Sequence, residues 1–175
     1  SEMDEARKEV KKLLDEVRKR DEDVTRKVEE LNKRIEERAK RVAEEVEKLI
    51  REILKRLRDG SRKEEARKLL EEVKRTVDKM IKELEELVRR SNRVVKEAVK
   101  ESRELIKRIL ERVEKVPVDE KILEDLRRLV KKLKEESDRS LERLERLNER
   151  LERRIREILK RLEKLVRELR KEVER

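Results

Sequence analysis

Aliphatic residues recur along most of this sequence at intervals of three and four, and charged residues fill most positions between them. From Met3 to Leu57 the apolar ridge takes fifteen steps over 54 residues, or 3.6 residues per step, and its last positions are Val46, Leu49, Ile53 and Leu57. This spacing is the period of an α-helix that buries one face and leaves the other in water. The pattern therefore predicts long amphipathic helices.

Two short breaks divide the pattern into three helices. At the first break, Gly60 can adopt the left-handed conformation that ends a helix, and Ser61 with Glu64 forms a capping box for the next one. At the second, Pro117 lacks the amide hydrogen that a helix interior needs, and Asp119 can cap the helix that follows. Loops this short make successive helices antiparallel. We expect one bundle over residues 1–175, with helices over about 2–58, 62–115 and 119–174.

The apolar positions also repeat at an interval of eighteen residues, which corresponds to about five turns of an ideal helix. A heptad repeat would instead drift by about 20° per heptad relative to a straight helix and would require supercoiling. We therefore predict an all-α, antiparallel three-helix bundle of long, nearly untwisted helices. The repeat includes the sets Leu126, Leu144 and Leu162; Leu133, Leu151 and Leu169; Leu123, Leu141 and Leu159; Leu69, Leu87 and Leu105; and Val77, Val95 and Val113.

The composition excludes most catalytic chemistry. Charged residues make up 59% of the chain and apolar residues 33%, with no His, Cys, Phe, Trp or Tyr and a single Gly. Such a chain has no imidazole base, thiolate nucleophile or zinc ligand set, and no glycine-rich loop to hold phosphate. We expect no catalytic, cofactor-binding or metal-binding residue, and hence no enzyme.

The charge distribution bears on partners. The formal net charge is +10, spread over the three helices, so we expect no specific nucleic-acid partner, only an incidental, salt-sensitive attraction to polyanions. No apolar run could cross a bilayer, and the opening residues do not look like a secretory signal, so we expect a soluble monomer without a targeting signal. Self-association stays open if Ala43, Leu54 or Val94 is exposed.

Small polar residues at or beside the apolar stripe stand out. Folding the sequence at its two loops places most of them near the middle of the bundle. Asn32, Ser91 and Asn148 are then expected within about one turn of one another, and Thr25 level with Ser140. We interpret them as a structural polar layer that fixes helix register; contact with water at the stripe edge is the alternative, and a ligand pocket is disfavoured. Asp21 also falls on the ridge, where we expect it to tilt outward, with Arg20 or a neighbouring helix as its partner. The predicted layer consists of Thr25, Asn32, Ser91, Ser102, Ser137, Ser140 and Asn148.

The strict interval in three helices, the minimal loops and the lack of aromatic residues resemble the parametrically designed de novo three-helix bundles. The resemblance covers the whole chain and carries no catalytic or binding motif. It implies a hyperstable structural scaffold without a natural biochemical function. The alternative is a spectrin-like spacer or a helix-mediated interaction module, in which aromatic anchors and irregular stutters would be expected.

Overall fold

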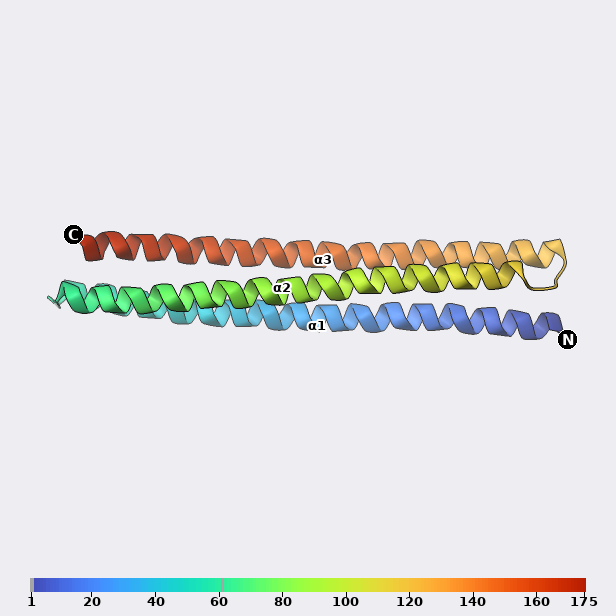
Figure 1. Ribbon diagram of the computed structural model, residues 1–175, viewed down its shortest axis with the longest axis horizontal. Helices are drawn as coiled ribbons and strands as arrows, with labels where there is room; N and C mark the ends of the chain where they lie inside the picture. The colour runs from blue at the N-terminus through green and yellow to red at the C-terminus, as the bar shows by residue number, and fades with distance from the viewer. Residues whose placement is uncertain (1, 61) are drawn as a thin grey trace. The chain divides into compact units, whose positions relative to one another are not determined.

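Three long helices make up nearly all of the computed structural model, which describes residues 2–60 and 62–175 apart from the side chains of residues 2, 3 and 6. Ser61, the predicted capping residue, and the side chain of Met3, where the predicted ridge begins, lie outside the described residues. Figure 1 shows the helices, which are α1 (Glu2–Arg58), α2 (Lys63–Glu114) and α3 (Glu120–Glu174).

The helix ends follow the predicted breaks. Gly60 has a φ of 87°, in the left-handed region, and the Asp59 amide donates a hydrogen bond to the Lys55 carbonyl oxygen at 3.0 Å. At the start of α3, the Asp119 carboxylate accepts a hydrogen bond from the Ile122 amide at 3.0 Å. The predicted left-handed glycine and the predicted Asp119 cap are both confirmed.

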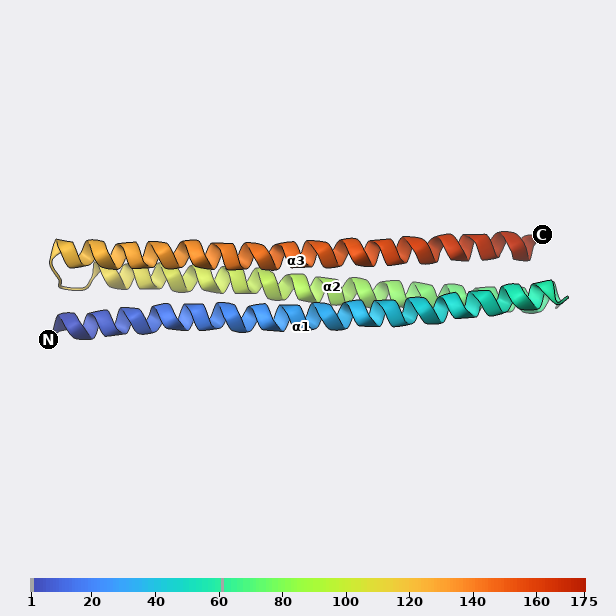
Figure 2. The same cartoon turned by 180° about the vertical axis from the view of Figure 1, so that it is seen from behind.

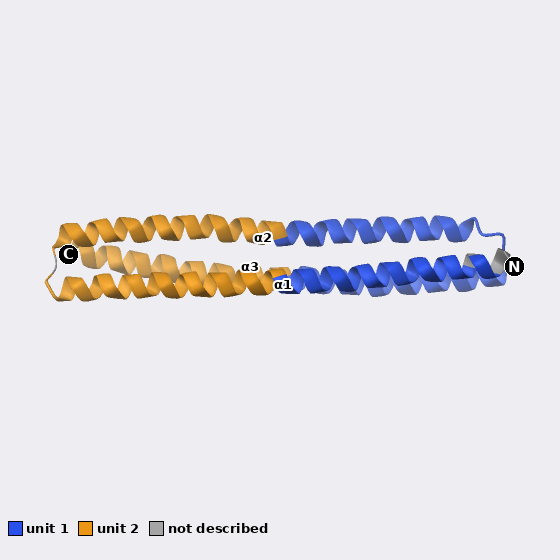
Figure 3. Ribbon diagram, turned by 90° about the horizontal axis from the view of Figure 1, so that it is seen from below, with its two compact units in different colours: residues 1–30, 91–147 blue, residues 31–90, 148–175 orange. Residues whose placement is uncertain are grey.

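The chain forms two compact units, and each helix contributes one segment to each of them. Unit 1 comprises Ser1–Glu30 and Ser91–Leu147, and unit 2 comprises Leu31–Arg90 and Asn148–Arg175 (Figure 3). Within each unit the α1 and α3 segments run in the same direction, and the α2 segment runs opposite to them (Figures 1 and 2). The predicted all-α three-helix bundle is confirmed.

Most of the apolar residues that recur at eighteen-residue intervals lie in the core of each unit, and Leu69, Leu87, Leu105, Leu123 and Leu159 are partly buried beside it. Leu126, Leu144 and Leu162 are each at most 3% exposed, and Leu133, Leu151 and Leu169 are each at most 4% exposed. An α-helix returns to the same face after eighteen residues, so the three members of each set meet the same environment. The core positions inferred from the repeat are thus confirmed for these leucines.

Leu49 is an exception to the predicted ridge of α1. Its exposed fraction is 44%, whereas the neighbouring Ile50 is only 3% exposed. Adjacent helical residues point about 100° apart, so the two side chains cannot both face the core. Ile50 occupies the inner position, and the prediction that Leu49 lies on the buried ridge is wrong. Ala43, Leu54 and Val94, which bear on self-association, are half-buried.

Candidate functional site

A layer of polar side chains divides the aliphatic core of unit 1. One apolar cluster in this unit includes Val17, Ile106 and Leu133, and a second includes Val28 and Leu141. In every helix a polar residue stands between the two clusters along the chain. These residues are Asp21 in α1, Ser102 in α2 and Ser137 in α3, with exposed fractions of 6%, 2% and 2%.

Asp21 and Ser102 are joined across two helices. The Ser102 hydroxyl donates a hydrogen bond to the Asp21 carboxylate at 2.8 Å. A neighbouring helix therefore supplies the partner of Asp21, as one of the two expected sources. The predicted outward tilt is wrong, because Asp21 is buried, and Arg20 pairs instead with Glu101 on α2.

An open groove between α1 and α3 is lined by two residues of this layer and by two further polar residues. Asp21, Thr25, Ser137 and Ser140 all lie along it, and its volume is about 620 Å³. Thr25 donates its hydroxyl hydrogen bond to the Asp21 carbonyl oxygen on its own helix at 2.7 Å, and Ser140 is half-buried. Among the described residues the Ser137 hydroxyl has no hydrogen-bond partner. The structure thus places Thr25 and Ser140 on one groove, as their predicted common level requires.

The two predicted asparagines form a second contact, in unit 2. The Asn32 side-chain amide donates a hydrogen bond to the Asn148 side-chain oxygen at 2.7 Å. Asn148 is 4% exposed and Asn32 is half-buried. Ser91 belongs to unit 1, where it is fully buried. The seven predicted residues are therefore distributed between the two units.

The burial of Asp21 against Ser102 was not predicted, although the sequence contains a pattern that indicates it. In the eighteen-residue alignment Asp21 shares its slot with Ala39 and Leu57, and folding the chain at its first loop brings it level with Ser102. The expectation of an outward tilt rested on the high free-energy cost of burying a lone carboxylate. The Ser102 hydroxyl reduces that cost by donating a hydrogen bond.

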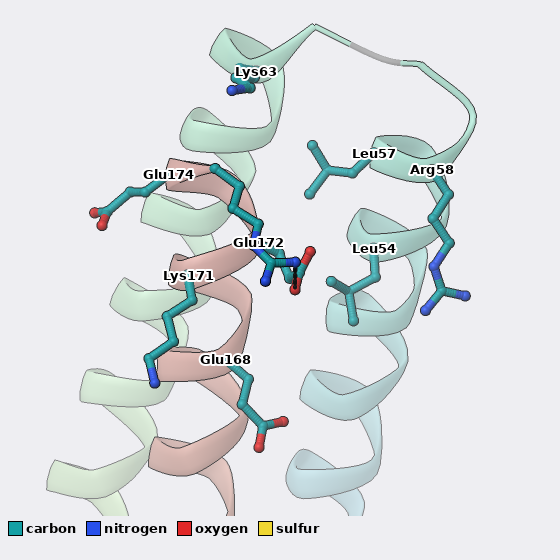
Figure 4. Close-up of a pocket in the computed structure, with 9 residues that line it drawn as sticks. Leu54, Leu57, Arg58, Lys63, Glu168, Lys171, Glu172 and Glu174 are labelled. Atoms are coloured by element: carbon teal, nitrogen blue, oxygen red, sulfur yellow. Dashed lines mark hydrogen bonds and ion pairs between the residues drawn. The ribbon is translucent and has the colours of Figure 1, made fainter.

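Another hollow lies at the end of unit 2 where α1 and α2 are connected (Figure 4). Its volume is about 910 Å³, and Leu54 and Leu57 contribute to it from α1. The charged groups around it are spread over the three helices, and Glu172 pairs with Arg175 at 3.5 Å. This arrangement does not bring an acid, a base and a nucleophile together, and we assign no chemistry to it.

Ion pairs between helices lie on the surface of each unit. Arg127 on α3 forms a bidentate ion pair with Glu114 on α2, in which it donates two hydrogen bonds of 2.7 Å to the carboxylate. The hydrogen bond from Arg127 lowers the pKa of the Glu114 carboxyl, and the same contact raises the pKa of the Arg127 guanidinium. Both groups are exposed, so the pair orients side chains and contributes little to stability.

Over residues 2–60 and 62–175, no group of three or more acidic side chains is placed to hold a metal ion. None of the helices in that part of the chain has an apolar stretch long enough to cross a membrane.

Comparison with known proteins supports the fold. The sequence matches no family model, and none of the curated proteins compared with it is significantly similar. Among solved structures, a computationally designed three helix bundle is similar to this chain with a TM-score of 0.57 and 20% sequence identity. The match covers 99% of this chain and 87% of the other. At this identity the likeness establishes a shared fold.

Proposed function

We propose that this chain is a designed structural scaffold, without a natural substrate, that folds as a hyperstable monomer. The observation that carries this proposal is the arrangement of aliphatic and polar side chains in its core. Aliphatic residues fill most of the core of each unit, and polar side chains are hydrogen-bonded between helices at Asp21 with Ser102 and at Asn32 with Asn148. Regular cores of this kind, built on strong helix formers and short loops, are typical of idealised design.

The polar layers have a structural task in this proposal. An aliphatic core alone allows one helix to slide by a turn against another at little change in free energy. A hydrogen-bonded pair such as Asn32 and Asn148 disfavours the shifted arrangement, because each amide would then be buried without its partner. The layers therefore trade some stability for a defined register.

The chemistry of the buried polar residues also disfavours an enzymatic function. The buried polar residues comprise one carboxylate, hydroxyls and amides, and the groove beside Asp21 brings no histidine or cysteine to it. Similarity to a computationally designed bundle supports the scaffold proposal. A turnover screen that finds activity above the buffer background would contradict it.

The proposal is tested by thermal and chemical denaturation with sedimentation over a range of concentrations. We expect a melting temperature well above the ~45 to 65 °C of mesophilic domains, and a monomer at every concentration. A cooperative melt below about 65 °C, or a sedimentation coefficient that rises with concentration, would contradict the proposal.

The registering role is tested separately with the double variant Asn32→Leu/Asn148→Leu. We expect each single leucine variant to be less stable than the double variant, because a single substitution leaves one amide unpaired. If the double variant keeps both the stability and the topology of the parent, this pair has no registering role.

A further inference from the structure

The net charge of the chain is concentrated in unit 2. Residues 31–90 and 148–175 contain 31 Lys or Arg and 22 Asp or Glu, a formal net charge of +9. Residues 1–30 and 91–147 contain 26 and 25, a net charge of +1. The basic charge is spread over three helices in the sequence, but it is not spread over the two units.

Within unit 2, a row of basic side chains follows one exposed side of α3 over five turns, with the exposed Glu157 and Glu163 beside it. Its six residues follow one another at intervals of three, four, four, three and four, so they lie on one side of the helix. All six are exposed, and together they span about 27 Å along the helix axis. This basic stripe consists of Arg153, Arg156, Lys160, Lys164, Arg167 and Lys171.

The positions eighteen residues earlier on α3 show that the eighteen-residue repeat does not by itself produce a basic stripe. Because eighteen residues make a whole number of turns, the positions eighteen residues earlier have the same angular positions on α3. Four of those six positions are acidic, whereas all six positions of the stripe are basic. The earlier residues are Glu135, Asp138, Glu142, Arg146, Glu149 and Arg153.

Most of the charge on the stripe is available to a partner. Arg156 makes a long ion pair of 3.8 Å with Glu152, and Arg167 donates to the Glu163 carbonyl oxygen at 3.5 Å. In the described part of the chain, Lys160, Lys164 and Lys171 make no ion pair within 4.0 Å. These three ammonium groups can therefore bind an external anion without breaking an internal contact.

We propose that the basic stripe of unit 2 binds the phosphate backbone of double-stranded DNA, without sequence preference. A DNA duplex carries about one negative charge per 1.7 Å of its axis, so a stripe of this length meets more phosphates than it has cations. Long lysine and arginine side chains on a helix face can reach backbone phosphates while the helix lies against the groove. Charge complementarity over about five turns of helix is the basis of the binding.

The composition argues against other polyanionic partners for the stripe. Single strands are held mainly by stacking of bases on aromatic side chains, and this chain contains no Phe, Trp or Tyr. A helix that lies in a membrane surface buries a broad apolar face in the lipid beside its basic residues. The apolar face of α3 in unit 2 is instead occupied by the core, where Ile155, Leu162 and Leu169 are each at most 3% exposed.

The test uses the full chain and a fluorescein-labelled DNA duplex of about 20 base pairs, with binding followed by anisotropy over a range of salt concentrations. Six phosphate contacts give a slope of about −5 for log K against log salt concentration. The variant Lys160→Gln/Lys164→Gln/Lys171→Gln is expected to reduce the magnitude of this slope by about 3 and to lower the affinity at least about tenfold.

A matched control variant distinguishes the effect of the stripe on DNA binding from the effect of the overall net charge. The variant Lys96→Gln/Lys100→Gln/Lys107→Gln makes the same three substitutions at exposed positions of α2 in unit 1. It loses the same net charge, and we expect its affinity to change by less than about twofold, because these lysines do not belong to the stripe that contacts the phosphates. Circular dichroism of both variants verifies that the helices are retained.

Equal losses in the two variants would overturn the proposal, since they would show a diffuse effect of net charge. Absence of salt-dependent binding by the parent chain would overturn it too. Vesicles containing phosphatidylserine serve as the second probe. Binding to these vesicles that depends on the three stripe lysines, without binding to the duplex, would assign the stripe to a membrane surface and overturn the DNA assignment.

Discussion

Two buried serines of unit 1 should differ in how much stability the chain loses when each is replaced by alanine. Ser102 and Ser137 are both 2% exposed, and both lie in α-helices, so replacement by alanine removes one hydroxyl from the same degree of burial. They differ in what the hydroxyl does. Ser102 donates to the Asp21 carboxylate at 2.8 Å, whereas the Ser137 hydroxyl makes no hydrogen bond to any described residue.

The magnitude follows from this difference. A hydrogen bond to a charged group contributes about 1.5 to 3 kcal/mol, and Ser102→Ala removes such a bond while Asp21 remains buried. Ser137→Ala removes a donor without leaving a partner unpaired. Both variants gain the same helix propensity of about 0.5 kcal/mol, which cancels when they are compared. Ser102→Ala should therefore be less stable than Ser137→Ala by about 1.5 to 3 kcal/mol.

Equilibrium denaturation in guanidinium chloride, followed by far-ultraviolet circular dichroism, measures this difference. In a thermal melt it corresponds to roughly 3 to 12 °C for a chain of this size. Free energies of unfolding that agree within about 0.5 kcal/mol for the two variants would refute the assignment of Ser102 as the partner that stabilises Asp21.

A double variant extends the same reasoning. In Asp21→Leu/Ser102→Ala both polar partners are replaced by apolar groups, and the groove beside position 21 leaves room for the leucine. Replacing both partners is close to neutral or stabilising, so the double variant should be at least as stable as Ser102→Ala alone. A double variant that loses the sum of the two single losses would contradict this.

Three further predictions concern other parts of the fold. Arg127→Gln should raise the pKa of Glu114 toward its ordinary value in a carboxyl titration followed by NMR. Because contact with Arg127 lowers that pKa in the folded chain, the contribution of the pair is present above the unfolded-state pKa and is lost as pH falls through the folded-state pKa. Gly60→Ala should lower the free energy of unfolding by about 1 to 2 kcal/mol in chemical denaturation, because alanine is strained at a φ of 87°. Gly60→Asn should lower it by less, and equal stability of the parent and both variants would count against this reason. Ile50→Ala should lower the free energy of unfolding by about 2 to 5 kcal/mol and Leu49→Ala by less than about 1, and the reverse order would contradict the assignment of Ile50 to the core.

The helices and their core were predictable because their causes are local. Spacing alone identifies the face that Leu144 and Leu162 share, and Gly60 and Asp119 mark helix ends through their own backbone chemistry. The exposure of Leu49 was not predictable in this way. Where adjacent residues are both apolar, the choice between them depends on packing against the other helices, which no single-helix pattern contains.

The polar layers were predictable as positions but not as contacts. The levels expected from antiparallel folding place Asn32 near Asn148 and Thr25 near Ser140, as the structure shows. Which hydroxyl reaches the Asp21 carboxylate depends on the orientation of side chains across helices. Periodicity gives the face and the level of a residue, but the donor and the acceptor of each bond come from the tertiary structure.

We infer that buried polar layers hold the helices of each unit in register, and distances between spin labels on two helices measure that register. The sequence contains no cysteine, so cysteines at the exposed positions Lys11 on α1 and Arg146 on α3 of unit 1 accept labels at those two sites alone. The contact between Arg18 and Glu136 fixes the relative level of the two helices and places these sites about 25 Å apart along their axes.

The measurement compares the parent with the variant Asp21→Leu/Ser102→Ala/Ser137→Ala, in which the layer of unit 1 is apolar. We expect a single narrow distance for the parent. For the apolar variant we expect further populations displaced by about 5 Å, the rise of one helical turn. A single distance, identical in both proteins, would show that aliphatic packing alone sets the register and that the polar layer has no part in it.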